Sequence, residues 1–253
     1  MLFTHSIFIG IDPSGGARAI AYSALDHDLR LVALGQGDLE ELIAFTGGQK
    51  SAFVAVNATQ RPNQGLLQKQ FEQNQLTSKP SRLKDFRLAE YELWRRKIPT
   101  YKTPSQNSVF KPWMQRGFSL YERLHTLGYR TYPQKESEKQ IMESHSSACY
   151  CIWLERAPLP KHGLEGRLQR QLALYDLGVN VKDPMRFFEE ITRHRLLQGN
   201  LPSNVLYSPG ELAALAAAYT AWKAANQPAR VALLGDVNEG QIVVPVAELN
   251  QLY

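Results

Sequence analysis

The strongest constraint on the fold is an apolar run at residues 6–12 that ends on Asp12 and breaks into the turn sequence Pro13-Ser14-Gly15-Gly16. A nearly continuous run of β-branched and aromatic residues is typical of a strand that is buried on both faces. Two further extended segments follow the turn, at residues 17–24 and 29–34. The pattern therefore predicts an antiparallel meander at the start of the chain.

Later segments alternate between short apolar runs and amphipathic stretches. Strands are predicted at 51–56, 129–132, 140–143 and 241–246. Helices are predicted at 38–45, 81–97, 116–127, 146–155, 165–177, 183–197 and 208–225. This order predicts an α/β fold, with a mixed sheet covered by helices. Because no Gly/Ser linker divides the chain, we expect a single domain over 1–253 with a helical, basic insertion at about 60–115.

The composition of the chain indicates its cellular compartment and the charge of its partner. With 253 residues and 43% hydrophobic content, the chain can bury a core without disulfides. Its two cysteines, Cys149 and Cys151, are too close to staple the fold, so we expect free thiols in a reducing cytoplasm. No apolar stretch approaches the roughly 20 residues of a membrane span. The net charge of +5 favours an anionic partner.

Three acids stand where an element begins or ends. Asp12 closes the first strand, and the glycines after it permit close approach of a ligand; the alternative is an Asx-turn that caps its own loop. Glu143 follows an apolar pair just before a helix, where a carboxylate also interacts favourably with the helix dipole. Glu211 completes a capping box with Ser208 around Pro209, which explains it without any function.

Two other groups of residues are open to more than one interpretation. His145 and Cys149 are spaced to share a metal on a helix, but no second ligand pair is evident, so a buried thiol is favoured over zinc. Residues 79–102 hold eight basic side chains against three acids, interleaved with aromatics. Such a segment suits a nucleic-acid backbone and stacked bases, and equally a solvated helix face. The residues predicted to bind nucleic acid are Arg82, Lys84, Arg87, Arg95, Arg96 and Lys97.

Several short motifs together resemble a known family. The opening Phe8-Ile9-Gly10-Ile11-Asp12-Pro13 resembles the first strand of ribonuclease-H-like nucleases, including Holliday-junction resolvases. More specifically, the chain resembles the predicted-nuclease family called domain of unknown function 429. The matching segments are 54–58, 141–148, 165–170, 212–221 and 235–240, which together span nearly the full length.

The resemblance implies a ribonuclease-H-like fold and a metal-dependent nuclease in which Asp12, Glu143 and Glu211 are both catalytic residues and ligands of Mg²⁺ or Mn²⁺. The family usually has an aspartate where this chain has Asn57, a proline at position 146 and an aspartate near Ala213. We expect the three acids to converge so that they can share one or two cations. Any two of them on opposite faces of the sheet would contradict this arrangement.

The predicted function is hydrolysis of nucleic-acid phosphodiester bonds, with DNA or RNA as the partner and no membrane. Two alternatives remain open. The first is a catalytically weakened ribonuclease-H-like module that binds nucleic acid or a protein, which Asn57 favours. The second is an actin-like nucleotide-binding phosphotransferase, although no second Gly-rich phosphate loop is evident.

Overall fold

A computed structural model describes residues 6–14, 19–73, 83–105 and 110–253, and within them the chain builds one eight-stranded mixed sheet. The strand order is β3-β2-β1-β4-β6-β8-β7, and β5 pairs with β6 alongside β8. The strands are β1 (Ile7–Asp12), β2 (Ile20–Leu25), β3 (Leu31–Gly37), β4 (Ala52–Val56), β5 (Arg130–Thr131), β6 (Lys139–Ser144), β7 (Ala232–Leu234) and β8 (Ile242–Val244).

Strand directions follow from the length of each connection. The strands joined by the short connections after β1 and β2 form antiparallel pairs, which confirms the predicted meander. Longer connections containing helices bring β4, and then β6, parallel to β1. The result is a mixed α/β sheet with helices on its faces, as predicted, and its topology is compatible with a ribonuclease-H-like fold.

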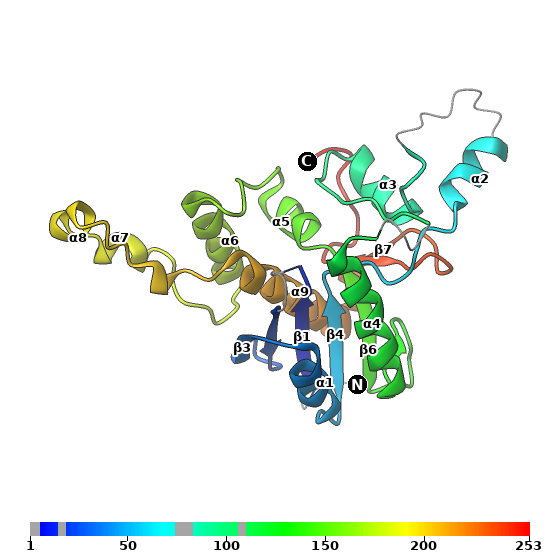
Figure 1. The fold of residues 1–253 in the computed structure, drawn as a ribbon, viewed down its shortest axis with the longest axis horizontal. Coiled ribbons are helices and arrows are strands. Elements are labelled where there is room, and N and C mark those ends of the chain that lie inside the picture. The colour runs from blue at the N-terminus through cyan, green and yellow to red at the C-terminus, as the bar shows by residue number, and fades with distance from the viewer. Residues whose placement is uncertain (1–5, 15–18, 74–82, 106–109) are drawn as a thin grey trace.

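Helices cover both faces of the sheet (Figure 1). On one face lies α9 (Pro209–Asn226), supported by α5 (Ser146–Leu154) and α6 (Leu164–Asp176). The other face is covered by α1 (Leu39–Gly47) and α4 (Pro112–Thr126). Alternate residues of β1 supply the two cores: Phe8 packs towards α9, whereas Ile9 and Ile11 pack towards α1 and α4.

The remaining helices lie at the periphery. These are α2 (Leu66–Gln73) and α3 (Leu88–Arg95) in the predicted insertion, and α7 (Arg186–Glu190) and α8 (Arg193–Leu197), which extend from the body as an arm in Figure 1. No helix within the described residues combines the length and the apolar character that crossing a membrane requires.

Two predicted helices need correction. The segment 183–197 forms two short helices rather than one, because Thr192 is extended and its side chain caps α8 by accepting from the backbone N–H of Arg195. The helix predicted over 81–97 begins only at Leu88 in the described residues, because Arg87 is extended and turns its side chain into the interior.

Candidate functional site

The carboxyl ends of β1, β4 and β6 meet at one edge of the sheet, which is where open α/β sheets place their ligand crevices. Two cavities of about 380 and 240 Å³ lie at this edge and share the side chains of Ser14 and Lys161. We call them together the Asp12 crevice. Its first cavity is lined by Asp12, Ser14, Gln36, Lys161, His162, Ser208, Pro209 and Gly210. Its second cavity is lined by Ser14, Asn57, Tyr101, Lys111, Trp113, His145, Ser146, Ser147 and Lys161.

Asp12 is almost fully buried at the floor of the first cavity. Its carboxylate accepts hydrogen bonds from the backbone N–H of Ser14 at 3.2 Å and from the Ser14 hydroxyl at 2.8 Å. The Asx-turn considered for Asp12 is therefore present, and the same carboxylate lines a cavity. Burial raises the pKa of Asp12, although the hydrogen bonds from Ser14 and Asn57 and the charge of Lys161 oppose the rise.

Asn57 follows β4 and bridges Asp12 to the start of α5. Its amide nitrogen donates to Asp12 Oδ1 at 3.1 Å, and its amide oxygen accepts from the backbone N–H of Ser146 at 2.8 Å. A carboxylate at position 57 could not donate to Asp12, and the two would repel each other unless a proton or a cation lay between them. The amide therefore satisfies Asp12 without a cation.

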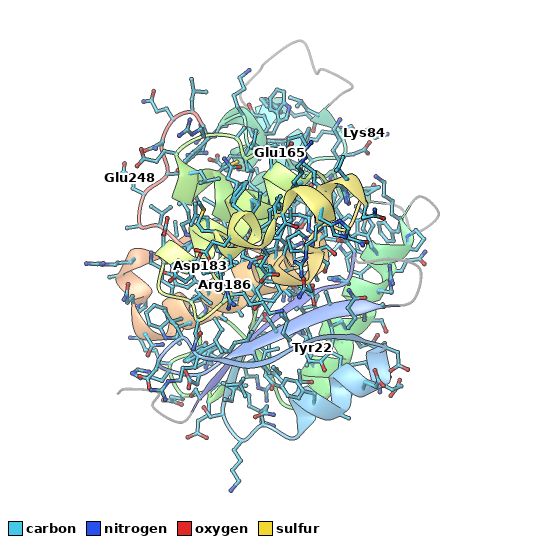
Figure 2. The ribbon with its side chains drawn as sticks, turned by 90° about the vertical axis from the view of Figure 1, so that its left-hand side faces the viewer. Tyr22, Lys84, Glu165, Asp183, Arg186 and Glu248 are labelled. Carbon is cyan, nitrogen blue, oxygen red and sulfur yellow. The ribbon has the colours of Figure 1, made fainter. Side chains whose placement is uncertain are left out.

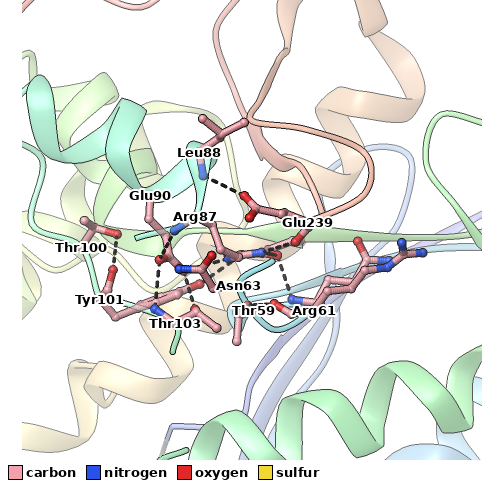
Figure 3. Close-up of polar contacts among 12 residues, drawn as sticks. Thr59, Arg61, Asn63, Arg87, Leu88, Glu90, Thr100, Tyr101, Thr103 and Glu239 are labelled. Atoms are coloured by element: carbon pink, nitrogen blue, oxygen red, sulfur yellow. Dashed lines mark hydrogen bonds and ion pairs between the residues drawn. The ribbon is translucent and has the colours of Figure 1, made fainter. Parts of the chain in front are cut away.

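Glu143 is also fully buried, but its carboxylate is held by the guanidinium group of Arg87, and Figure 3 shows Arg87 among its polar neighbours Glu90 and Glu239. Arg87 Nη1 donates to Glu143 Oε2 at 2.9 Å, and Nη2 donates to Oε1 at 2.5 Å. The backbone N–H of Gln60 and the hydroxyl of Tyr101 donate to the same carboxylate. The lone pairs that a cation would use are thus occupied by the protein's own donors.

Arg87 is the centre of this buried network. Its Nε donates to Glu90 at 2.9 Å, and its Nη1 also donates to the backbone carbonyl of Glu239 at 2.9 Å. Burial alone would lower the pKa of Arg87, but the charges of Glu143 and Glu90 outweigh it and raise the pKa well above its ordinary value. Arg87 was predicted to face nucleic acid, and its full burial removes it from the surface.

Glu239 is a buried carboxylate that the sequence interpretation missed. Its Oε1 accepts from the backbone N–H groups of Gln64 and Leu66, and its Oε2 accepts from that of Leu88. One side chain thereby caps the first turns of both α2 and α3, because helix N-termini leave N–H groups unpaired. The segment Gly235-Asp236-Val237-Asn238-Glu239-Gly240, which looked like a family motif, therefore anchors the insertion to the sheet.

Glu211 lies in the first turn of α9 and has the capping role that its sequence suggested. Its carboxylate accepts from the backbone N–H of Ser208 at 2.7 Å, and the Ser208 hydroxyl accepts from the N–H of Glu211 at 3.2 Å. The turn before it, Ser208 to Gly210, lines the Asp12 cavity. The start of α9 therefore reaches the crevice, while Glu211 is half-buried beside it.

The structure does not gather the three acids around one point. Glu143 pairs in register with Val56, which pairs with Ile11, so these three side chains leave the sheet on the α4 face. Asp12, one residue further on, leaves on the α9 face. No group of three His, Cys, Asp or Glu side chains within the described residues could hold a metal ion. The expected convergence of the three acids is therefore wrong, because Asp12 and Glu143 leave the sheet on opposite faces. A role for Asp12, Glu143 or Glu211 in metal binding or catalysis stays a prediction.

No sequence pattern pointed to two lysines and a histidine that line the crevice. Lys161 and His162 are exposed in the loop between α5 and α6, and Lys111 is exposed before α4. Asp12 is the one carboxylate among the described residues that line the two cavities. The crevice therefore presents two ammonium groups against a single carboxylate, which favours an anionic ligand.

Helix α6 holds two walls of the crevice in place. Arg170 donates to the carbonyl of Leu159 at 2.7 Å, and Gly166 packs so closely on Pro160 that an added Cβ would lie 1.9 Å from its carbonyl oxygen. These contacts fix the loop that carries Lys161. Arg167 donates to the carbonyls of Leu206 and Tyr207, which fixes the segment leading into α9. The motif at 165–170 thus serves as a scaffold for the crevice.

The other predicted nucleic-acid residues are scattered. Lys84 and Lys97 are exposed, and Figure 2 shows Lys84 at the periphery of the molecule. Arg95 and Arg96 both form ion pairs with Glu92, whereas Arg82 lies outside the described residues. Whether these residues bind nucleic acid stays a prediction.

The two cysteines and His145 are buried and contribute to packing and to a helix cap. Cys149 and Cys151 are buried free thiols, as predicted. His145 caps α5 by accepting from the backbone N–H of Ala148 at 3.2 Å. Burial and the nearby charge of Arg87 lower the pKa of His145 to about 4, so its ring is neutral at pH 7.

A family model described as a protein of unknown function, DUF429, matches residues 10–237. This span contains Asp12, Asn57, Glu143 and the whole Asp12 crevice. No curated protein and no solved structure matches the chain.

Proposed function

The chain belongs to the DUF429 family, and from its geometry we propose that it is a catalytically weakened ribonuclease-H-like module that binds nucleic-acid phosphodiesters at the Asp12 crevice. The observation that carries this proposal is that Lys161 lines both cavities and Lys111 lines the second, whereas the single carboxylate of the crevice, Asp12, is already satisfied by the Asn57 amide. A crevice with excess positive charge attracts an anion without needing a bridging metal.

Backbone groups support the same proposal. Ser146 and Ser147 begin α5, Pro209 and Gly210 begin α9, and all four line the crevice. The Ser146 N–H already donates to Asn57 and Pro209 has no N–H, so Ser147 and Gly210 supply the N–H groups that a phosphate would meet. The N–H groups in the first turn of a helix and the positive end of its dipole favour phosphate. Two helix starts and two lysines around one opening suit a chain of phosphates better than a single carboxylate ligand.

Binding of labelled DNA and RNA strands to a Lys111→Ala/Lys161→Ala variant tests the proposal. We expect at least tenfold weaker binding at low salt, because two phosphate contacts are lost. The charge-matched control is Lys50→Ala/Lys135→Ala, which removes two exposed lysines that lie outside the crevice. Equal losses in both variants would show that binding follows net charge rather than this site.

Metal-dependent hydrolysis is the second candidate, and the placement of Asp12 favours it. A buried carboxylate at a strand end, facing a cavity, is a position from which Mg²⁺ or Mn²⁺ could be held. Against it, Asn57 offers Asp12 its amide nitrogen, and Glu143 is held by Arg87. The donor set therefore does not fit a two-metal site.

Incubation of labelled strands with Mg²⁺, Mn²⁺ or EDTA separates the two candidates. We expect binding in EDTA and no cleavage with either metal. Metal-dependent cleavage by the wild type that disappears in Asp12→Asn, while binding persists, would establish a nuclease and overturn the weakened-site proposal.

A further inference from the structure

One wall of the second cavity of the Asp12 crevice is aromatic, and phosphate binding alone gives these rings no role. Trp113 lies edge-on to Tyr101 with ring centroids 4.9 Å apart, and Tyr101 stacks on His145 at 5.0 Å. All three residues line the cavity beside Asn57, Lys111 and Lys161. Aromatic rings next to cationic groups are the combination that binds a base together with its phosphate.

The three rings differ in how freely they can meet a ligand. His145 is buried, and its Nε2 contacts the hydroxyl of Thr100 at 3.2 Å, so its ring is fixed. The Tyr101 hydroxyl donates a hydrogen bond to Glu143, and the Tyr101 ring contacts both other rings. Trp113 stands in the first turn of α4 and is only partly buried. Trp113 is thus the ring backed by fixed neighbours and open to the cavity.

Resting on the proposed function, we infer that the Asp12 crevice takes an unpaired nucleotide, with its base against Trp113 and its phosphate at Lys161. Lys161 and Ser14 line both cavities, so a phosphate there lies between the aromatic wall and Asp12. Single strands, loops and ends fit this description, because their bases can turn out of the stack.

The aromatic wall requires a base that has left its stack. Trp113 lines a cavity of about 240 Å³ beside Tyr101 and His145. Bases within a duplex present their faces to one another rather than to a protein ring. A duplex could meet Lys111 and Lys161 with its backbone but could not place a base on Trp113.

The test compares a labelled single strand, the same strand with abasic sites throughout, and the corresponding duplex, each by fluorescence anisotropy. We expect Trp113→Ala to weaken binding of the single strand by about tenfold, as loss of one base–aromatic stack predicts. Binding of the abasic strand should change less than twofold, because it keeps its phosphates. Trp113→Phe retains a ring and should stay within about threefold of the wild type.

Trp94→Ala is the matched control, because this tryptophan is 48% exposed on α3 and does not line the crevice. Melting curves of each variant confirm folding, and Trp113→Leu, which fills the position without an aromatic ring and should show the same loss, tests the inference if Trp113→Ala does not fold. Single-strand binding that is insensitive to Trp113 but sensitive to Lys161, or equal binding of duplex and single strand, would overturn this inference alone. If none of the tested nucleic acids binds, the proposed function itself is overturned.

Discussion

At the scale of single residues, two acids with similar sequence settings have opposite electrostatic environments. Asp12 and Glu143 both lie near the end of an apolar strand, which the sequence predicts correctly. Asp12 receives only neutral donors, whereas Glu143 receives a full guanidinium charge. The sequence could not predict this difference, because Arg87 is 56 residues before Glu143 in a segment that reads as an exposed basic helix.

Asn57→Asp tests whether the amide replaces a cation. We predict that this variant melts at a lower temperature than the wild type in EDTA, because two adjacent carboxylates repel each other. Mn²⁺ should raise its melting temperature by more than it raises that of the wild type, since binding to the folded state stabilises it. Asn57→Ala serves as the control, because it loses the hydrogen bond without adding charge. An Mn²⁺ response in Asn57→Asp no larger than in Asn57→Ala would contradict the prediction.

The second prediction concerns Arg87, which forms a buried ion pair, and Arg95, which forms an exposed one. Arg87→Ala should lower the free energy of unfolding by about 3–5 kcal/mol, because it leaves buried carboxylates without a partner. Arg95→Ala should change it by less than about 1 kcal/mol, because solvent screens the pair with Glu92. Urea denaturation measures both. Similar losses would mean that the buried network contributes no more than a surface pair.

The third prediction concerns pH and His145. Its pKa in the folded state is about 4, below the ordinary value of 6.5, so the unfolded chain takes up a proton that the folded protein does not. Stability should therefore fall as the pH drops from about 6.5 to 4, by roughly 3 kcal/mol from this group. His145→Asn can keep the helix cap and should remove this part of the pH dependence. His194→Asn, at an exposed position, is the control, and an unchanged pH profile in His145→Asn would refute the assignment.

At the scale of elements, local signals predicted some helices well and others poorly. The capping box and Pro209 placed α9 within one residue of its observed bounds. The helix expected at 183–197 is broken, because Thr192 offers a competing cap that hydrophobic spacing does not reveal. The role of α6 also escaped prediction, because its contacts join loops that are distant in the sequence.

The packing of α9 on β1 gives the fourth prediction. A Cβ at Gly10 would lie 1.9 Å from the carbonyl oxygen of Ala214 and 2.3 Å from the backbone nitrogen of Ala218, so the helix would have to move. Gly10→Ala should lower the free energy of unfolding by about 3 kcal/mol or more, the upper end for overpacking. Gly35→Ala in β3 is the matched control in the same sheet, because its nearest contact is the flexible Tyr22 side chain at 3.4 Å. A Gly10→Ala variant as stable as Gly35→Ala would contradict this packing.

At the scale of the whole molecule, the crevice is assembled from segments that lie far apart in the sequence. The sequence predicted the sheet and the edge at which Asp12 lies, since apolar runs and turns define the strands. It did not point to Lys111 or Lys161, because isolated lysines in loops carry no periodic signal. It drew attention instead to the basic segment, where Arg87 is buried and Arg95 and Arg96 share Glu92.

The most direct test of phosphate binding at the Asp12 crevice is the salt dependence of nucleic-acid affinity, measured in EDTA by fluorescence anisotropy. The slope of log affinity against log salt reports the number of phosphates contacted, at about −0.7 to −0.9 for each. We predict a slope shallower by about 1.4 to 1.8 units in Lys111→Ala/Lys161→Ala, and by less than one unit when Arg95, Arg96 and Lys97 are all neutralised. An unchanged slope in the crevice variant, with a shift of two or three units in the triple variant, would move the interface to the basic segment and contradict the proposed site.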